Sequence, residues 1–233
     1  GALATTSAIS VGVFEETMGK ILDSGRDVLY LAFSSALSTT YQSAVIAAED
    51  LKESHPGGKV LVVDSLCASL GQGLLVYLCA MEKRKGKTLE EVHAFAEAAK
   101  GKVCHWFTVD DLNHLKRGGR ISAATALVGT MLSIKPVLHV DDTGHLVSVG
   151  KARGRKASLL ALVDHMEKTG NPDIKDQMIF ISHGDCLEDV EKLKAIIRRR
   201  IGCENFMVNP VGAVIGSHSG PGTVALFFLG SER

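Results

Sequence analysis

Residues 28–41 read VLYLAFSSALSTTY, an apolar run that gives way to a cluster of hydroxyl side chains. The apolar part, Val28 to Phe33, has the length and composition of a buried strand. From Thr39 to Glu53 apolar residues recur mainly at helix-like steps, which predicts a helix. The stretch therefore predicts a strand, a polar turn and a helix, the repeating unit of an α/β sheet.

The same alternation of strand-like and helix-like patterns extends to both sides of this stretch. Upstream, residues 10–23 predict a helix with Ser10 at its cap. Downstream, Lys59–Val63 (KVLVV) predicts a second strand, and residues 70–85 predict the helix that follows it. Thr88-Leu89-Glu90-Glu91 is a capping box that opens a further helix. Strand–helix units joined by short loops favour a parallel sheet covered by helices.

After Gly101 the pattern changes to hairpins mixed with helices. Asp142-Thr143-Gly144 is a hairpin turn signal between two strand-like runs. The elements expected here are strands at 103–109, 135–140, 146–151, 177–182, near 206 and at 223–229, and helices at 121–131, 156–168 and 187–201. We therefore expect an α/β protein of two lobes: an N-terminal parallel three-layer α/β/α domain at residues 1–101, and a C-terminal α/β domain with a mixed or antiparallel sheet at 102–233.

Composition and charge exclude several classes of protein. Lys and Arg number 26, as do Asp and Glu, so the formal net charge is zero, which disfavours nucleic acid as a partner. The apolar stretches are shorter than the about 20 residues that span a membrane, and no leader is seen, so we expect a soluble, cytoplasmic protein. The 5 cysteines lack Cys-x-x-Cys spacing, which predicts buried, reduced thiols rather than a disulfide framework or a zinc site.

Four segments place hydroxyl side chains and glycines at the ends of strands or in loops. They are residues 6–10 (TSAIS), 34–40 (SSALSTT), 64–71 (DSLCASLG) and 216–222 (GSHSGPG). In a parallel sheet, ligands lie beyond the carboxyl ends of the strands, and exposed amides at a helix start favour an anion. The same side chains also serve as helix caps and turn residues. The spacing alone leaves the two interpretations about equally supported.

Metal and covalent chemistry receive less support from the sequence. The histidines show no His-x-x-x-His spacing, so no metal site is expected. Ser35, His218 and Asp64 are a possible triad, but no Gly-x-Ser-x-Gly elbow surrounds Ser35. The glycines match neither phosphate-binding fingerprint. A hydrolase or kinase-related enzyme that uses Ser35 with His218 is the alternative to a binding protein.

Two basic clusters contain glycines between their charges. Residues 116–120 read KRGGR and residues 151–156 read KARGRK. Most such clusters are solvated surface, but interleaved glycines indicate a shaped loop. Contact with a partner protein or with phosphate is the alternative for both.

The motifs taken together, in their order along the chain, resemble the DegV family. The matching segments are Thr6-Ser7, Ser34-Ser35-Ala36-Leu37-Ser38-Thr39-Thr40-Tyr41, Asp64-Ser65 with Ser69-Leu70-Gly71, Leu115 to Ile121 (LKRGGRI), Lys135-Pro136, Arg153, and Gly216 to Gly222. The resemblance covers essentially the whole chain, and an ordered series of matches is far more specific than any single one.

The resemblance implies a carrier that binds a long-chain fatty acid between its two lobes and is not itself an enzyme. It implies that Thr6, Ser35 and His218 contact the carboxylate. The implied supporting loop residues are Ser7, Ser34, Ser38, Ser217 and Gly220. No cofactor is implied, and hydroxyl, imidazole and amide donors would satisfy the head group without a metal.

The resemblance also implies a partner. The carrier would present its carboxylate to a separate ATP-dependent fatty acid kinase subunit, which makes an acyl phosphate for phospholipid metabolism. Arg153, Arg155 and Lys156 look like the docking surface for that kinase. No nucleic acid is implied, and a transient contact with a membrane surface is compatible with a lipid carrier.

Two departures from the family pattern affect these expectations. DegV-like proteins normally carry a first strand ending in Asp-Ser and a helix before the Thr-Ser loop, whereas this sequence begins almost at that loop. We therefore expect the first lobe to lack part of its sheet. Thr39 stands where the family usually has glycine, which would alter the backbone of the loop but leaves Ser35 intact.

Overall fold

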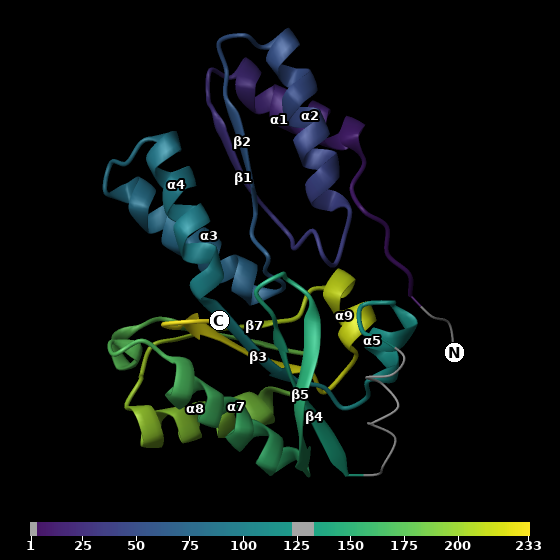
Figure 1. Ribbon diagram of the computed structural model, residues 1–233, viewed down its shortest axis with the longest axis vertical. Helices are drawn as coiled ribbons and strands as arrows, with labels where there is room; N and C mark the ends of the chain where they lie inside the picture. The colour runs from purple at the N-terminus through teal and green to yellow at the C-terminus, as the bar shows by residue number, and fades with distance from the viewer. Residues whose placement is uncertain (1–3, 123–132) are drawn as a thin grey trace. The chain divides into compact units, whose positions relative to one another are not determined.

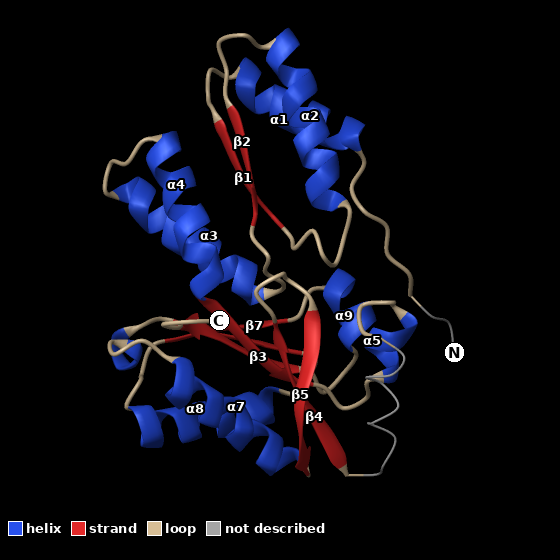
Figure 2. Cartoon of the chain, viewed as in Figure 1, coloured by secondary structure: helices blue, strands red, loops and turns tan. Residues whose placement is uncertain are grey.

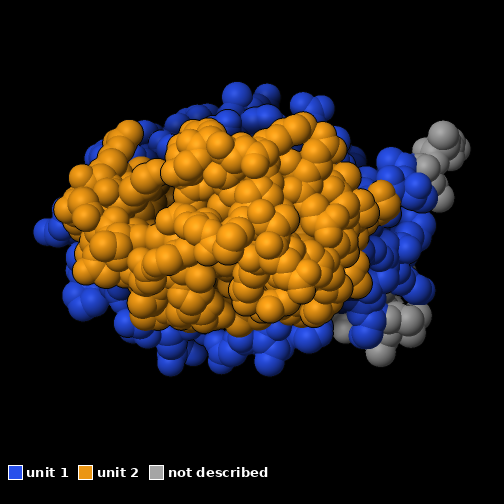
Figure 3. Space-filling view, turned by 90° about the horizontal axis from the view of Figure 1, so that it is seen from above, with its two compact units in different colours: residues 1–6, 69–71, 102–233 blue, residues 7–68, 72–101 orange. Residues whose placement is uncertain are grey.

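A computed structural model of the chain describes residues 4–122 and 133–233. These residues form two compact units, coloured separately in Figure 3. Unit 2 contains residues 7–68 and 72–101, and unit 1 contains the described parts of 1–6, 69–71 and 102–233. The sequence suggested a single division after residue 101, whereas two short segments from the first hundred residues belong with unit 1.

Unit 2 is built around two parallel strands, β1 (Val28–Ala32) and β2 (Val60–Asp64), with Val28 opposite Val60. Helices α1 (Val11–Asp23) and α2 (Thr40–Ser54) pack side by side against these strands (Figure 1). Their core contains the following residues: Phe14, Met18, Leu22, Val28, Ala44, Ala47 and Leu51. Side chains alternate across a strand, so Val28 and Tyr30 reach this core while Leu29 and Leu31 point to the other face.

The other helices are α3 (Leu70–Arg84), which belongs to unit 2 from residue 72 onward, and α4 (Leu89–Ala99). The predicted capping box is present: the Thr88 hydroxyl accepts from the amide of Glu91, and the Glu91 carboxylate accepts from the amide of Thr88. The predicted strands and helices of this region are confirmed to within two residues at their ends. The structure therefore confirms a parallel α/β arrangement here.

Unit 1 contains a six-stranded sheet in the order β5-β4-β3-β8-β6-β7. The strands are drawn in red in Figure 2. Its strands are β3 (Val103–Thr108), β4 (Ile134–Val140), β5 (Leu146–Arg153), β6 (Ile179–His183), β7 (Phe206–Pro210) and β8 (Val224–Leu229). The pair β6–β7 is parallel and the other pairs are antiparallel, so the sheet is mixed, as predicted.

Two long helices of unit 1, α7 (Arg155–Thr169) and α8 (Leu187–Ile201), pack against each other and against the sheet. Their apolar faces form the core with residues such as Leu162, Met166, Leu193 and Phe228. Shorter helical segments are α5 (Asn113–Arg117), α9 (Ala213–Ser219), η1 (Lys100–Lys102) and η3 (Ile174–Asp176).

The sequence-based expectations for this region differ from the structure at two short helices. Residues 216–219 form the end of α9 rather than a glycine-rich loop, and Lys116 and Arg117 end α5. Most of the helix expected at 121–131 lies outside the described residues. Both α5 and α9 span fewer than two full turns, and their mixed composition carries no clear period.

All 5 cysteines are free thiols, and only Cys186 is not fully buried. Burial raises the pKa of the Cys79 and Cys104 thiols to about 11. In the described part of the chain, no helix has the length and apolar character needed to cross a membrane.

Candidate ligand-binding site

Two of the predicted head-group residues meet in unit 1. Thr6 lies in the extended segment before α1, and His218 lies in the last turn of α9. The Oγ1 of Thr6 is 2.8 Å from Nε2 of His218, and the pair is partly buried. The imidazole tautomer decides which group donates. The fold thus joins a hydroxyl and an imidazole that are separated by 212 positions in sequence.

The other edge of the His218 ring faces the backbone of Gly118. A Cβ atom on Gly118 would come within 3.0 Å of Nδ1, so a larger residue here would displace the ring. The guanidinium of Arg120 donates from Nη1 to the carbonyl of Gly118. Burial, and next the charge of Arg120, lower the pKa of His218, which favours the neutral imidazole.

The glycine-rich segment after His218 is fixed by Arg155. Its Nη2 donates to the carbonyl of Gly222 at 2.6 Å, and its Nε donates to Oδ2 of Asp189 at 2.7 Å. The amide of Gly222 donates in turn to the carbonyl of Gly184 at 2.7 Å. Gly222 has a φ of +73°, a conformation that favours glycine. The chain is therefore held on both sides a few residues beyond His218.

In unit 2, the hydroxyl-rich segment follows β1 directly. Ser34 is fully buried and its carbonyl accepts from the amides of Leu37 and Ser38. Ser35 is exposed, and its backbone amide donates to Oδ1 of Asp64 at 3.1 Å. Asp64 ends the neighbouring strand, so the carboxyl ends of β1 and β2 meet as the parallel topology predicts.

The arrangement of unit 2 bears on the triad considered for Ser35. Asp64 accepts the backbone amides of Ser35 and Leu66, and His218 pairs with Thr6. In a hydrolytic triad a carboxylate orients the histidine. His218 bonds the Thr6 hydroxyl through Nε2, and its Nδ1, where the carboxylate of a triad would bind, faces the backbone of Gly118. The convergence of Ser35 with Thr6 and His218 on one carboxylate stays a prediction.

The predicted supporting residues have different environments. Ser7 is exposed, and Ser38 bonds Thr40 through its Oγ at 2.8 Å. Ser217 donates to the carbonyl of Val214 within α9 at 2.7 Å. Gly220, with a φ of +77°, lies against the imidazole of His114. The hydroxyls of Ser38 and Ser217 are thus bonded within their own segments, whereas Ser7 is exposed.

The three predicted docking residues also differ. Arg153 and Lys156 are exposed, whereas the Arg155 side chain is 19% exposed and committed to Asp189 and Gly222. A docking role for each stays a prediction. The sequence shows the charge of an arginine but not its burial, so it did not separate Arg155 from its neighbours.

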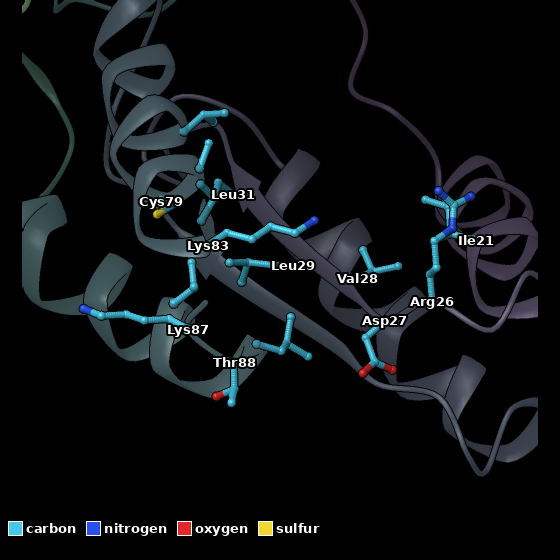
Figure 4. A pocket seen from close by; sticks show the side chains of 14 residues that line it. Ile21, Arg26, Asp27, Val28, Leu29, Leu31, Cys79, Lys83, Lys87 and Thr88 are labelled. Atoms are coloured by element: carbon cyan, nitrogen blue, oxygen red, sulfur yellow. The ribbon is translucent and has the colours of Figure 1, made fainter. Parts of the chain in front are cut away.

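Unit 2 also contains a pocket of about 580 Å³ beside β1 (Figure 4). Leu29 and Leu31 line it from the strand, together with Cys79 and Lys83 from α3 and Thr88 at the start of α4. Its volume lies in the range of small-molecule sites. None of the predicted head-group residues is among those that line it.

Gly118 and Arg120 are the residues beside His218 that the sequence did not single out for this site. They belong to the KRGGR cluster. The sequence left two interpretations of this cluster open, a solvated surface or a contact with a partner protein or with phosphate. The interleaved glycines were the available signal, since a glycine between charges marks a close backbone approach. Which group approaches could not be read from the sequence.

Comparison with known protein families gives a match along almost the whole chain. The model of the DegV family, described as uncharacterised protein, matches residues 1–231. A DegV domain-containing protein of Clostridium perfringens is 47% identical over 234 residues, which cover 100% of this chain and 80% of the relative. The family match and the order of the motifs along the sequence therefore indicate the same family.

Solved structures support the same assignment. A DegV family protein from Thermus thermophilus, described by its fatty acid binding, is 34% identical with a TM-score of 0.85, covering 98% of this chain and 80% of that one. The Streptococcus pneumoniae Fatty Acid Kinase (Fak) B3 protein loaded with linoleic acid shares the fold, with a TM-score of 0.86 at 23% identity over 96% of this chain and 77% of that one. The predicted fold class is confirmed, and this chain belongs to the DegV family.

Proposed function

We propose that this protein binds a long-chain fatty acid by its carboxylate and presents it to a separate ATP-dependent fatty acid kinase. The observation that carries the proposal is the Thr6–His218 pair, a hydroxyl and an imidazole held 2.8 Å apart at a partly buried position. The fatty acid binding of the Thermus thermophilus relative, at 34% identity, supports the ligand class.

The free energy of binding would come mainly from the acyl tail. Burying each CH₂ group contributes about 0.8 kcal/mol, so a tail of about sixteen carbons contributes on the order of 10 kcal/mol before ordering costs. A carboxylate taken from water is costly unless several donors satisfy it. The hydroxyls of Thr6 and Ser35, the imidazole of His218 and the amides at the start of α2 are the donors we propose for it.

We propose a carrier rather than an enzyme. In a triad the carboxylate binds Nδ1 of the histidine, and Nδ1 of His218 faces the backbone of Gly118. The Fatty Acid Kinase (Fak) B3 protein of Streptococcus pneumoniae, whose fold this chain shares, carries a kinase partnership in its name. That partnership is the reason to place the chemistry on a second protein.

Mass spectrometry of a denaturing organic extract tests the ligand. We expect one fatty acid per protein in the purified material. Ser35→Ala should weaken rebinding by about 1–3 kcal/mol, the cost of removing a donor from a buried charge. Ser43→Ala, on α2 with a long 3.4 Å bond to its own helix, is the matched control and should bind normally. Delipidated wild-type protein that binds no long-chain acid would refute the proposal.

The kinase contact is tested separately at Arg153, which is exposed at the end of the edge strand β5. Arg153→Ala should leave lipid affinity unchanged and lower the rate of lipid phosphorylation about tenfold, as expected for an interface arginine. Arg199→Ala, an exposed arginine on α8, is the control for loss of one surface charge. The measurement is phosphorylation by a fatty acid kinase at limiting carrier. Equal rates for both variants would remove Arg153 from the docking surface.

A further inference from the structure

A single carboxylate oxygen joins the two loops that follow β1 and β2 in unit 2. Oδ1 of Asp64, the last residue of β2, accepts the backbone amide of Ser35 at 3.1 Å and that of Leu66 at 3.2 Å. The first bond crosses to the loop after β1, and the second closes an Asx turn within the loop that follows Asp64 itself. Asp64 is half-buried, so both bonds are partly shielded from water.

The backbone around this oxygen is held by further contacts. The amide of Ser34 donates to the carbonyl of Cys67 at 3.0 Å, which is a second bond between the same two loops. Leu66 has a φ of +52°, a conformation that an L-residue adopts only where its surroundings impose it. The two loops therefore form one bonded layer, and Asp64 fixes the backbone of Ser35 within it.

The bond to Asp64 decides how Ser35 meets a ligand. The carboxylate occupies the amide of Ser35, so the hydroxyl is the donor that remains for a bound head group. Ser35 is exposed, and its side chain is thus open to a ligand. A donor on a fixed backbone loses less conformational entropy when it binds than a donor on a mobile loop.

We infer that Asp64 is the positioning residue for Ser35: its Oδ1 holds the backbone from which the Ser35 hydroxyl reaches the carboxylate of the fatty acid. The inference rests on the proposed function and adds to it a residue that acts through Ser35 without touching the ligand. The charge of Asp64 is not part of this role, because a second carboxylate nearby disfavours an anion. The role requires only an oxygen acceptor at this place.

The same pair of strands carries a matched contact at its opposite end. Oδ1 of Asp27, which directly precedes β1, accepts the amide of Lys59, which directly precedes β2, at 2.8 Å. Both aspartates thus link the β1 side to the β2 side through a bond from a backbone amide to a carboxylate. Asp27→Ala therefore reports what the loss of such a bond does to unit 2 as a whole.

The experiment measures the binding of hexadecanoic acid to the delipidated full chain by displacement of a fluorescent fatty-acid probe. Asp64→Ala and Ser35→Ala should each weaken binding about tenfold, which lies in the range for loss of one hydrogen bond to a charge. The variant with both substitutions should also lose about tenfold rather than a hundredfold, because the two residues act as one donor. Asp27→Ala should bind the acid as wild type does.

Two conservative variants separate the position of the acceptor from its charge. Asp64→Asn keeps an oxygen acceptor in place without the charge, and should bind the acid at least as tightly as wild type. Asp64→Glu keeps the charge but moves the acceptor by one methylene group, and should weaken binding. This pair decides the matter if urea unfolding shows that Asp64→Ala does not fold, and the opposite order of affinities would assign the effect to charge and overturn the inference.

Three results with the alanine variants would also overturn the inference. They are a normal affinity in Ser35→Ala or Asp64→Ala, fully additive losses in the double variant, and an equal loss in Asp27→Ala. The last two would show that Asp64 stabilises the unit without acting through Ser35. Wild-type protein that binds no hexadecanoic acid would instead overturn the proposed function itself.

Discussion

Gly71→Ala is expected to destabilise the protein by about 3 kcal/mol, the upper part of the range for overpacking a buried site. A Cβ on Gly71 would come within 3.0 Å of three atoms of the His105 ring. The ring has nowhere to move, because His105 is 2% exposed and its Nδ1 lies 2.8 Å from the carbonyl of Val103. Its other side meets the Phe227 ring edge-to-face, with centroids 5.3 Å apart.

A double-mutant cycle, measured by urea unfolding, tests whether the clash with the His105 ring causes this loss of stability. In a His105→Ala background the obstacle is gone, so Gly71→Ala should become neutral or stabilising by up to about 1 kcal/mol, the helix preference of alanine over glycine. Gly101→Ala is the control, because a Cβ at Gly101 meets nothing within 4 Å. An equal loss of stability in both backgrounds would show that the cost arises from the backbone of α3 and not from the imidazole.

The sequence was sufficient for the fold because the strands and long helices carry strong local patterns. Val28–Phe33 and Lys59–Val63 are apolar runs bounded by polar turns, and β1 and β2 lie within one residue of them at each end. The capping box at Thr88 specifies a helix start through two hydrogen bonds between neighbours in sequence. Signals of this kind need no knowledge of distant residues.

The candidate site depends on contacts that no local pattern encodes. Thr6 and His218 were expected to serve one head group, and the structure joins them by a hydrogen bond. Gly118, about a hundred positions earlier, lies against the same ring, and Arg120 donates to its carbonyl; the packing of α5 against α9 brings this turn there. Helices that short are specified by tertiary contacts rather than by propensity, so their partners could not be inferred.

The burial of Arg155 is another feature that the sequence does not show. Arg155→Met should lower the free energy of unfolding by about 3 kcal/mol. Breaking a buried ion pair by removing one partner leaves the other charge uncompensated. The side chains of Arg155 and Asp189 are 19% and 18% exposed, and their Nε and Oδ2 atoms are 2.7 Å apart. The carbonyl of Gly222 loses its donor as well. Arg153→Met, two positions earlier and exposed, should change the stability by less than about 0.5 kcal/mol.

The pH dependence of the stability difference between wild type and Arg155→Met tests whether the loss of the Arg155–Asp189 ion pair is its cause. Burial raises the pKa of Asp189, but hydrogen bonds from Arg155 and Lys192 outweigh burial and hold it below its ordinary value. A depressed carboxyl pKa stabilises the folded state above the unfolded pKa of about 3.9, and that contribution is lost as the pH falls through the folded value. The difference in the free energy of unfolding between wild type and Arg155→Met, measured in urea, should therefore be largest at neutral pH and should decrease in acid.

A second variant separates the ion pair from simple loss of packing. Arg155→Met combined with Asp189→Leu removes both charges, and replacing both partners of a buried pair by apolar residues is often nearly neutral. Most of the lost stability should return, and the remaining deficit should no longer depend on pH near the carboxyl pKa. If the double variant were as unstable as Arg155→Met alone, the Gly222 carbonyl rather than Asp189 would be the partner that matters, and Arg155 would act chiefly by holding the segment that follows His218.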